Sequence, residues 1–129
     1  MSDSNQLGSF ESLVTDRFEL RAEWDGSILV ITLVGDLTNN LIPEARNRLD
    51  NLLSSKRRLK AVFDFSDLEY ITSVGCGLLA RLAQRIEDTS GKVAGVESKS
   101  QSVHSVFSIL RFGSLVNLTT DLETAKKTL

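Results

Sequence analysis

The sequence predicts an α/β fold: one domain with a mixed, mainly parallel sheet, an N-terminal β-hairpin and about four helices. An antiparallel hairpin pattern opens the domain, and short apolar strands then alternate with amphipathic helices to the C-terminus. Strands that alternate with helices are joined by right-handed crossovers and lie parallel, whereas the opening hairpin makes the sheet mixed. A chain of 129 residues can build one hydrophobic core and is most simply one domain.

The hairpin is expected at the start of the domain, which we place at residues 18–129. Its first strand alternates apolar and charged residues, the apolar ones being Phe18, Leu20 and Ala22. Asp25-Gly26 is a hairpin turn signal, and the β-prone run 28–34 supplies the second strand. Residues 1–17 are expected to be a loose tail or short extension, because their first part is rich in Ser, Asn, Asp and Gln.

The rest of the chain alternates helices with strands. The first helix carries an apolar stripe of Ile42, Ala45, Leu49, Leu52 and Leu53. The second begins near Val74 and carries Leu78, Leu79, Leu82, Ala83 and Ile86. Strands are expected at 59–65, 92–96 and 115–118. Two capping boxes, Ser98-x-x-Gln101 and Thr120-x-x-Glu123, predict the starts of the last two helices.

The composition and charge of the chain limit the classes of function that it could have. The net charge of -2 argues against nucleic-acid binding, which usually needs a basic face. The basic run Lys56-Arg57-Arg58 is interpreted as a solvated helix end. The longest apolar run is too short to insert into a membrane, and no signal peptide is recognisable. The single cysteine, Cys76, permits no internal disulfide and fits a cytoplasmic protein, which we expect to be a monomer or weak dimer.

The most informative segment runs from Val62 to Leu79. A buried strand enters a tight polar turn that ends in Thr72-Ser73, and Gly75 opens an apolar helix. This order places a hydroxyl at a helix N-terminus, where free N–H groups and the helix dipole favour negative charge. A phosphorylatable serine there would act as a switch rather than as a catalyst. The simpler interpretation of Ser73, compatible with the first, is an N-cap.

These residues resemble the STAS family, and within it the bacterial anti-sigma-factor antagonists. A typical family core reads D-L-S-G-L-x-F-I-D-S-S-G-L-G, and residues 64–77 read D-F-S-D-L-E-Y-I-T-S-V-G-C-G. Residues 34–38, V-G-D-L-T, are similar to the family's G-E-L-D turn after the second strand. The order of elements matches from about Phe18 to Leu129.

The resemblance implies a protein-binding switch. The dephosphorylated form of such an antagonist binds an anti-sigma factor, often itself a serine kinase, and a phosphatase resets the phosphorylated form. The phosphoacceptor of the pattern falls on Ser73. Thr72 and Thr38 stand where the family has aspartates, and Val74 replaces the second serine. The alternative is therefore a STAS-like scaffold or adaptor subunit of a signalling or lipid-transport assembly without a phospho-switch.

The candidate partner contacts surround Ser73. They are Asp36, Thr38, Thr72, Val74, Gly75, Leu78 and Arg81. A core position is the plainer interpretation of Leu78, and a solvated turn is the plainer one of Asp36. Gly75-Cys76-Gly77 lacks the lysine of a phosphate-binding loop and suggests close approach of the helix to the turn or to a partner.

Enzymatic chemistry finds little support in the sequence, and we expect no catalytic residue, metal or cofactor. A receiver domain with Asp64 as acceptor would need an acidic pair after the first strand and a lysine after the last, and the sequence offers only Asp36. Cys76 with His104 as a base matches no known hydrolase spacing. Because His104 is the only histidine, a histidine-based metal cluster cannot form.

Overall fold

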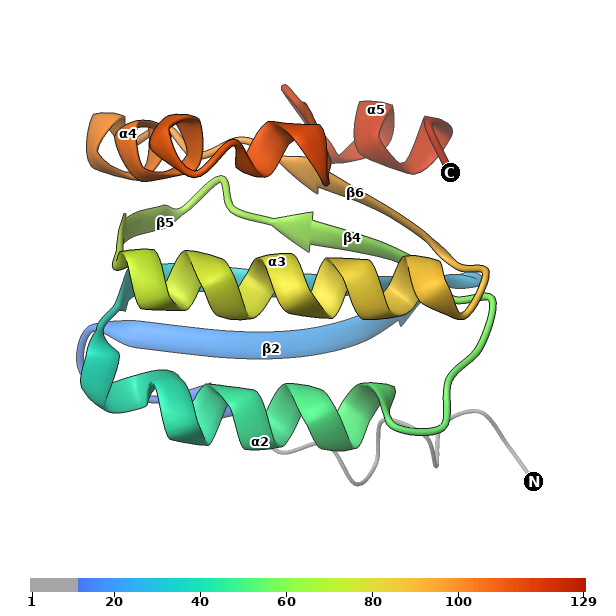
Figure 1. Cartoon of the computed structure of the whole chain (residues 1–129), viewed down its shortest axis with the longest axis horizontal. Helices are drawn as coiled ribbons and strands as arrows, with labels where there is room; N and C mark the ends of the chain where they lie inside the picture. The colour runs from blue at the N-terminus through green and yellow to red at the C-terminus, as the bar shows by residue number, and fades with distance from the viewer. Residues whose placement is uncertain (1–11) are drawn as a thin grey trace.

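The computed structural model describes residues 12–129 and confirms the predicted mixed α/β class (Figure 1). The strands are β1 (Leu13–Val14), β2 (Phe18–Asp25), β3 (Ile28–Leu37), β4 (Lys60–Asp64), β5 (Leu68–Ile71), β6 (Lys92–Val96) and β7 (Asn117–Thr119). The helices are α2 (Ile42–Leu53), α3 (Ser73–Asp88), α4 (Gln101–Ile109) and α5 (Leu122–Lys127), with short 3-10 turns η1 (Asn39–Leu41) and η2 (Phe112–Ser114).

All seven strands form one sheet. Its order is β1-β2-β3-β4-β6-β7, and β5 pairs with the far end of β3 beyond β4. The β1–β2 and β2–β3 pairs are antiparallel and the others are parallel. In the hairpin Asp25 faces Ile28, so Gly26 and Ser27 form the two-residue loop. Gly26 has a φ of 62°, a left-handed conformation that glycine adopts without steric cost.

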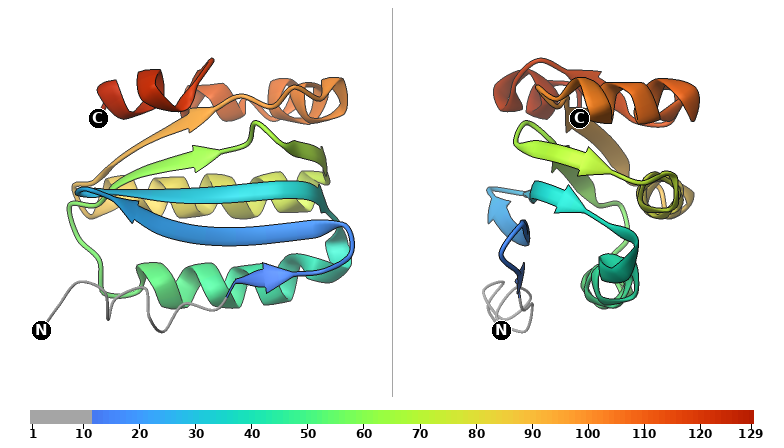
Figure 2. Two further views of the ribbon diagram at one scale, coloured as in Figure 1. Left: turned by 180° about the vertical axis from the view of Figure 1, so that it is seen from behind. Right: turned by 90° about the vertical axis from the view of Figure 1, so that its left-hand side faces the viewer.

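Helices cover the two faces of the sheet unequally. In the side view α2, α3 and α4 lie on one side of the strands and α5 on the other (Figure 2). The main core lies under the first three helices, and four phenylalanine rings pack against one another there, in stacked and edge-to-face pairs: Phe63, Phe65, Phe107 and Phe112. A small second cluster, in which Ala125 of α5 meets Val62, Ala94 and Val96, fills the opposite face. The parallel strands all point toward the same end of the sheet, where β5 leads into α3 (Figure 1).

Two strands were not expected from the sequence. Leu13 and Val14, within the predicted tail, pair with Leu20 and Glu19 to form β1; residues 1–11 of that tail lie outside the described part of the chain. β5 occupies what was expected to be only a polar turn. Its central residues are exposed and only its ends are buried, so its sequence lacks the alternation that identifies a strand.

The prediction of a capping box at the start of each of the last two helices was wrong. Ser98 is buried: its hydroxyl donates to the Leu68 carbonyl of β5 at 2.6 Å, and Ser100 is the N-cap of α4. α5 is capped by Asp121, whose carboxylate accepts from the Thr124 N–H at 2.8 Å. The Ser100 hydroxyl also donates to β5, to the Glu69 carbonyl at 2.8 Å. Both serines before α4 are therefore hydrogen-bonded to β5. Within residues 12–129 β5 pairs only with β3, and its other edge is held by these two serine side chains.

Candidate functional site

The first turn of α3 is capped by Thr72. The Thr72 backbone is extended, and its Oγ1 accepts a hydrogen bond from the Gly75 N–H at 3.0 Å. The Thr72 carbonyl accepts the first helical hydrogen bond, from the Cys76 N–H at 2.9 Å. The interpretation of Ser73 as the N-cap is therefore wrong. Threonine keeps the capping function that an aspartate would have at this position, without its charge.

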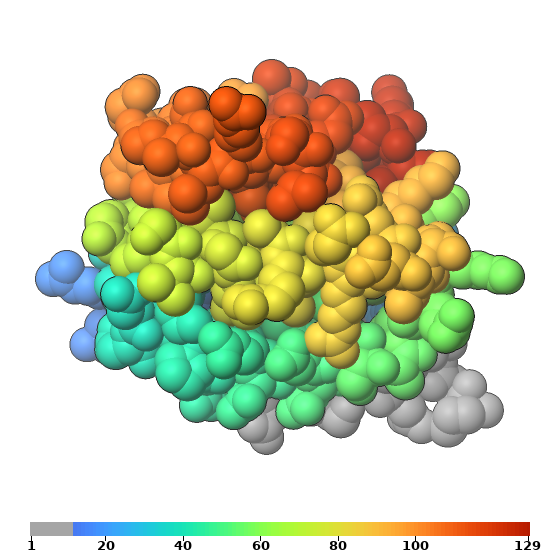
Figure 3. Space-filling model, viewed as in Figure 1, coloured from blue at the N-terminus to red at the C-terminus, as the bar shows by residue number. Residues whose placement is uncertain are grey.

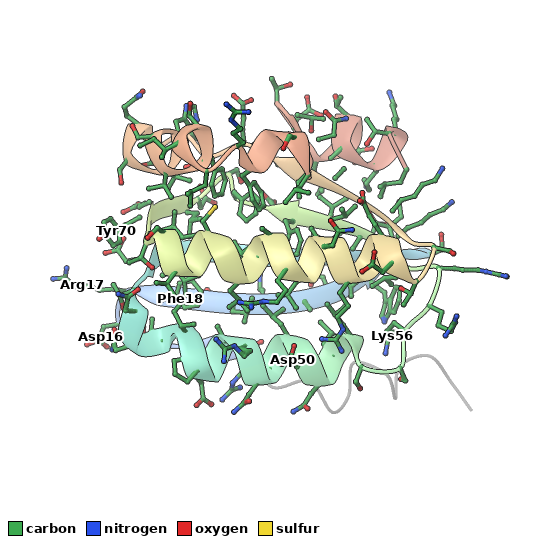
Figure 4. All side chains as sticks on the ribbon, in the orientation of Figure 1. Asp16, Arg17, Phe18, Asp50, Lys56 and Tyr70 are labelled. Atoms are coloured by element: carbon green, nitrogen blue, oxygen red, sulfur yellow. The ribbon has the colours of Figure 1, made fainter. Side chains whose placement is uncertain are left out.

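Ser73 is the first residue of α3 and is exposed. Within residues 12–129 its hydroxyl has no hydrogen-bond partner, since Thr72 performs the capping. Two large hydrophobic residues close to it in the sequence are exposed to solvent: Tyr70 is 44% exposed and Val74 is 53% exposed. Figure 4 shows Tyr70 pointing outward at the end of the molecule where α3 begins. Tyr70 was not among the predicted contacts. The signal that the sequence offered was an aromatic residue three positions before the serine.

Thr38 and Thr72 stand beside one another at the ends of two neighbouring strands. β3 and β5 are parallel, with Leu37 opposite Ile71 as the last pair. Thr38 and Thr72 follow these two residues directly, so the two positions of the missing aspartates adjoin. The Thr38 hydroxyl donates to the side-chain oxygen of Asn40 at the start of η1.

Asp36 lies on β3 opposite Tyr70 and is half-buried. The preceding Gly35 has a φ of 89°, and a Cβ there would lie 2.0 Å from the Arg17 carbonyl oxygen. Only glycine fits this approach of β2 and β3, where the Asp36 N–H donates to the same carbonyl at 2.8 Å. A hollow of about 430 Å³ opens here, lined in part by Asp16, Arg17 and Asp36. Figure 4 shows Asp16 and Arg17 at the same end of the molecule as Tyr70.

The remaining predicted contacts divide between surface and core. Arg81 is exposed. Leu78 is 2% exposed and belongs to the main core, and Gly75 is buried with its Cβ position 3.0 Å from Ile71 Cγ1. Gly75 and Leu78 are thus held inside the domain and are not available to a partner in this structure. Their role here is to seat α3 on the sheet.

Cys76, His104 and Asp64 do not form a catalytic set. Cys76 is 1% exposed, and burial raises the pKa of its thiol to about 11. His104 Nε2 contacts the Ser98 carbonyl instead. Asp64 Oδ1 accepts from the Ser66 N–H at 3.0 Å and from the Ser66 hydroxyl at 2.7 Å, which closes the turn after β4. Across residues 12–129, no three Asp, Glu, His or Cys side chains are grouped so that they could hold a metal ion.

In the described part of the chain, no helix combines the length and apolar character that crossing a bilayer requires.

The comparison with protein families identifies the class. The STAS domain model matches residues 19–125, so this chain belongs to the STAS domain family. No curated protein sequence matches.

Solved structures agree with this assignment at the level of fold. An anti-sigma factor antagonist from Mycobacterium paratuberculosis aligns with a TM-score of 0.76 and 16% identity, over 89% of this chain and 96% of that one. SpoIIAA, an anti-sigma factor antagonist, aligns in its unphosphorylated form with a TM-score of 0.69 and 20% identity, over 84% and 95% of the two chains. The phosphorylated Bacillus form aligns with 0.63 and 18%, over 85% and 99%. The murine anion transporter Slc26a9 aligns with 0.60 and 15%, over 81% of this chain but 18% of the transporter.

Proposed function

We propose that this chain is a regulatory binding module of the anti-sigma-factor antagonist type. Its dephosphorylated form binds an anti-sigma factor that is also a serine kinase, phosphorylation of Ser73 releases that partner, and a phosphatase restores the binding form. The module catalyses nothing itself, and we place it in the cytoplasm. The observation that carries the proposal is the Ser73 hydroxyl, exposed on the first turn of α3 and relieved of capping by Thr72.

The surroundings of Ser73 suit a switch by direct obstruction. Tyr70 and Val74, three residues before and one residue after Ser73, present exposed apolar surface on which a partner could pack near the hydroxyl. A phosphoserine adds about -1.5 to -2 charges. The helix N-terminus tolerates this charge, because its free N–H groups and dipole offset it. The domain therefore stays folded, and the penalty falls on the complex.

The loss of binding affinity on phosphorylation follows from the cost of desolvating the phosphate. A partner packed on Tyr70 and Val74 would have to desolvate the phosphate on Ser73 or lose its contacts with this surface. A penalty of about 3–4 kcal/mol weakens binding by a few hundred-fold, since about 1.4 kcal/mol corresponds to tenfold. No conformational change is needed to explain release.

The test is a pull-down from the source cell with wild type, Ser73→Ala and Ser73→Asp. We expect Ser73→Ala to retain the partner constitutively and Ser73→Asp to lose it. Intact mass after incubation with ATP and the captured kinase should show one added phosphate on Ser73. Equal capture by both variants, or phosphate on another residue, would contradict the proposal. Because Thr72 is a neighbouring hydroxyl, the phosphosite must be mapped by fragmentation.

A second candidate function is a STAS scaffold or adaptor subunit without a phospho-switch. The specific observation in its favour is the pair Thr38 and Thr72, which leaves both acidic positions of the family pattern neutral. This function predicts a partner that binds wild type, Ser73→Ala and Ser73→Asp alike. The pull-down thus separates the two functions.

A further inference from the structure

The outward face of α3 carries a glycine that the fold does not require. At 100° per residue, Gly77 lies at the centre of the exposed side of α3, opposite the buried stripe. Apart from its chain neighbours and the nearby backbone of α3, a Cβ added at Gly77 would meet no atom of residues 12–129 within 4 Å. By contrast, a Cβ at Gly75 would press on Ile71, Leu37 and Ile42. Packing within the domain therefore explains Gly75 and leaves Gly77 unexplained.

Glycine in an exposed helix interior has a cost. Relative to alanine it lowers the folding equilibrium constant by roughly two- to fivefold. At Gly77 nothing within residues 12–129 offsets that cost. Close approach of a ligand or of another backbone is one reason for a glycine that packing within the fold does not require. Gly77 lies one helical turn after Ser73, so a partner that covers Ser73 passes over Gly77 as well.

Beside this face lies a cationic hollow between α2 and α3. Its volume is about 270 Å³, and its lining residues are Arg46, Asp50, Leu78, Arg81, Leu82 and Arg85. The Asp50 carboxylate forms a salt bridge with the Arg85 guanidinium, with 2.8 Å between Asp50 Oδ1 and Arg85 Nη1. Arg46 and Arg81 are exposed and have no ion-pair partner within residues 12–129. Three guanidinium groups against one carboxylate leave the hollow with an excess of positive charge. α3 lies at the middle of the molecular surface formed by α2, α3 and α4 (Figure 3).

We infer that an acidic segment of the partner protein docks along α3, with its backbone against Gly77 and its carboxylates on Arg81 and Arg46. Charge complementarity selects this occupant, because arginine binds carboxylates in a bidentate geometry and these two groups are otherwise unmatched. The inference rests on the proposed function, since the partner is the one whose binding Ser73 controls. It adds the partner's chemistry and the direction in which the interface extends from Ser73.

Two pairs of variants test the surface, each with a matched control. Gly77→Ala adds one methyl group on α3, and Gly113→Ala adds the same group at an open position on η2. Arg81→Ala removes one charge at the hollow, and Arg57→Ala removes one from the basic run 56–58, which lies at the end of the domain opposite Ser73 and does not line the hollow. Figure 4 shows the position of the neighbouring Lys56 at that end.

The first measurement needs no partner. In urea unfolding, Gly77→Ala is expected to raise the midpoint, with a two- to fivefold larger folding constant. A lower midpoint would show that the fold needs this glycine and would overturn the inference. The second measurement uses the partner recovered by the wild type and lost by Ser73→Asp, purified and titrated by calorimetry. We expect at least tenfold weaker binding for Gly77→Ala, five- to tenfold for Arg81→Ala with a smaller salt dependence, and less than twofold for both controls.

The outcomes separate this inference from the proposed function. Weaker binding by Gly77→Ala and Arg81→Ala, with no difference between Ser73→Ala and Ser73→Asp, would refute the switch and keep the surface. Unchanged binding by Gly77→Ala or Arg81→Ala, with an intact Ser73 effect, would refute the surface alone. If no partner is captured, poly-L-glutamate serves as the probe in an NMR titration. Amide shifts along 77–85 that Arg81→Ala abolishes would support the inference, whereas shifts confined to 56–58, or a dimer of this chain that buries α3, would overturn it.

Discussion

Replacing Thr72 tests which hydroxyl holds the N-terminus of α3. In the structure Thr72 Oγ1 accepts from the Gly75 N–H at 3.0 Å, and Ser73 makes no equivalent bond. Loss of an N-cap side chain costs about 0.5–2 kcal/mol, typically about 1. With about 2.1 cal/mol/K of unfolding entropy per residue over 129 residues, 1 kcal/mol shifts Tm by about 4 °C. Thr72→Ala should therefore lower Tm by about 4 °C, and Ser73→Ala by less than 2 °C.

Thr72→Asp extends the same argument to charge. An aspartate caps at least as well as threonine and adds a favourable interaction of about 0.3–1 kcal/mol with the helix dipole. The chain already contains such a cap in Asp121, whose pKa is lowered first by the hydrogen bond from the Thr124 N–H. A lowered folded-state pKa contributes stability above the unfolded value of about 3.9. The gain from Thr72→Asp should thus be present at pH 7 and disappear as the pH falls through the folded-state pKa.

The assay is urea unfolding of wild type, Thr72→Ala, Thr72→Asp and Ser73→Ala at pH 7 and pH 3. The expected order at pH 7 is Thr72→Asp above wild type and Thr72→Ala below it, with Ser73→Ala close to wild type. A loss in Ser73→Ala as large as that in Thr72→Ala would mean that Ser73 is the cap. A Thr72→Asp variant less stable at pH 7 than Thr72→Ala would refute the capping geometry altogether.

Two further predictions concern buried side chains. Ser98→Ala should destabilise the domain by about 1–3 kcal/mol in urea unfolding, because the Leu68 carbonyl loses its buried donor, whereas the exposed Ser102→Ala should change stability by less than about 0.5 kcal/mol. Cys76 should resist a thiol-specific reagent at pH 8 in the folded state and react fully in urea, because a thiol with a pKa of about 11 is only about 0.1% thiolate at that pH. Rapid modification of the folded protein would contradict the burial of Cys76.

The sequence was sufficient to predict the class of sheet, because each of its longer elements carries its own periodicity. The hairpin turn, the apolar run of β3 and the stripe of α3 are all local signals. The position of Ser73 at the start of α3 followed from the same signals. β1 and β5 could not be predicted in this way. β5 is defined by its pairing with residues 35–37 and by the Ser98 and Ser100 side chains, about thirty residues further along the chain.

The identity of the cap shows a second limit of sequence reasoning. Thr72 and Ser73 are adjacent hydroxyl residues, and both are common at the N-cap. The choice depends on where the extended backbone of β5 turns into α3, which is a property of the strand that the sequence did not indicate. The exposed Tyr70 was missed for the same reason, since its orientation follows from the register of β5 against β3.

The neutral pair Thr38 and Thr72 determines where a phosphate on Ser73 would act. Aspartates at these adjoining strand ends would repel a phosphoserine from within the domain, since like charges at short range disfavour the modified state. With threonines at both positions, this chain offers no such repulsion, and the phosphate is left with the favourable N-terminus of α3. Its destabilising effect is then confined to the complex. Arg81 lies about 12 Å along the helix from Ser73. An acidic segment of the partner that binds Arg81 at one end would lie near the phosphate at its other end, so the segment would be attracted by Arg81 and repelled by the phosphate. The same charge that binds the partner would make the interface sensitive to Ser73.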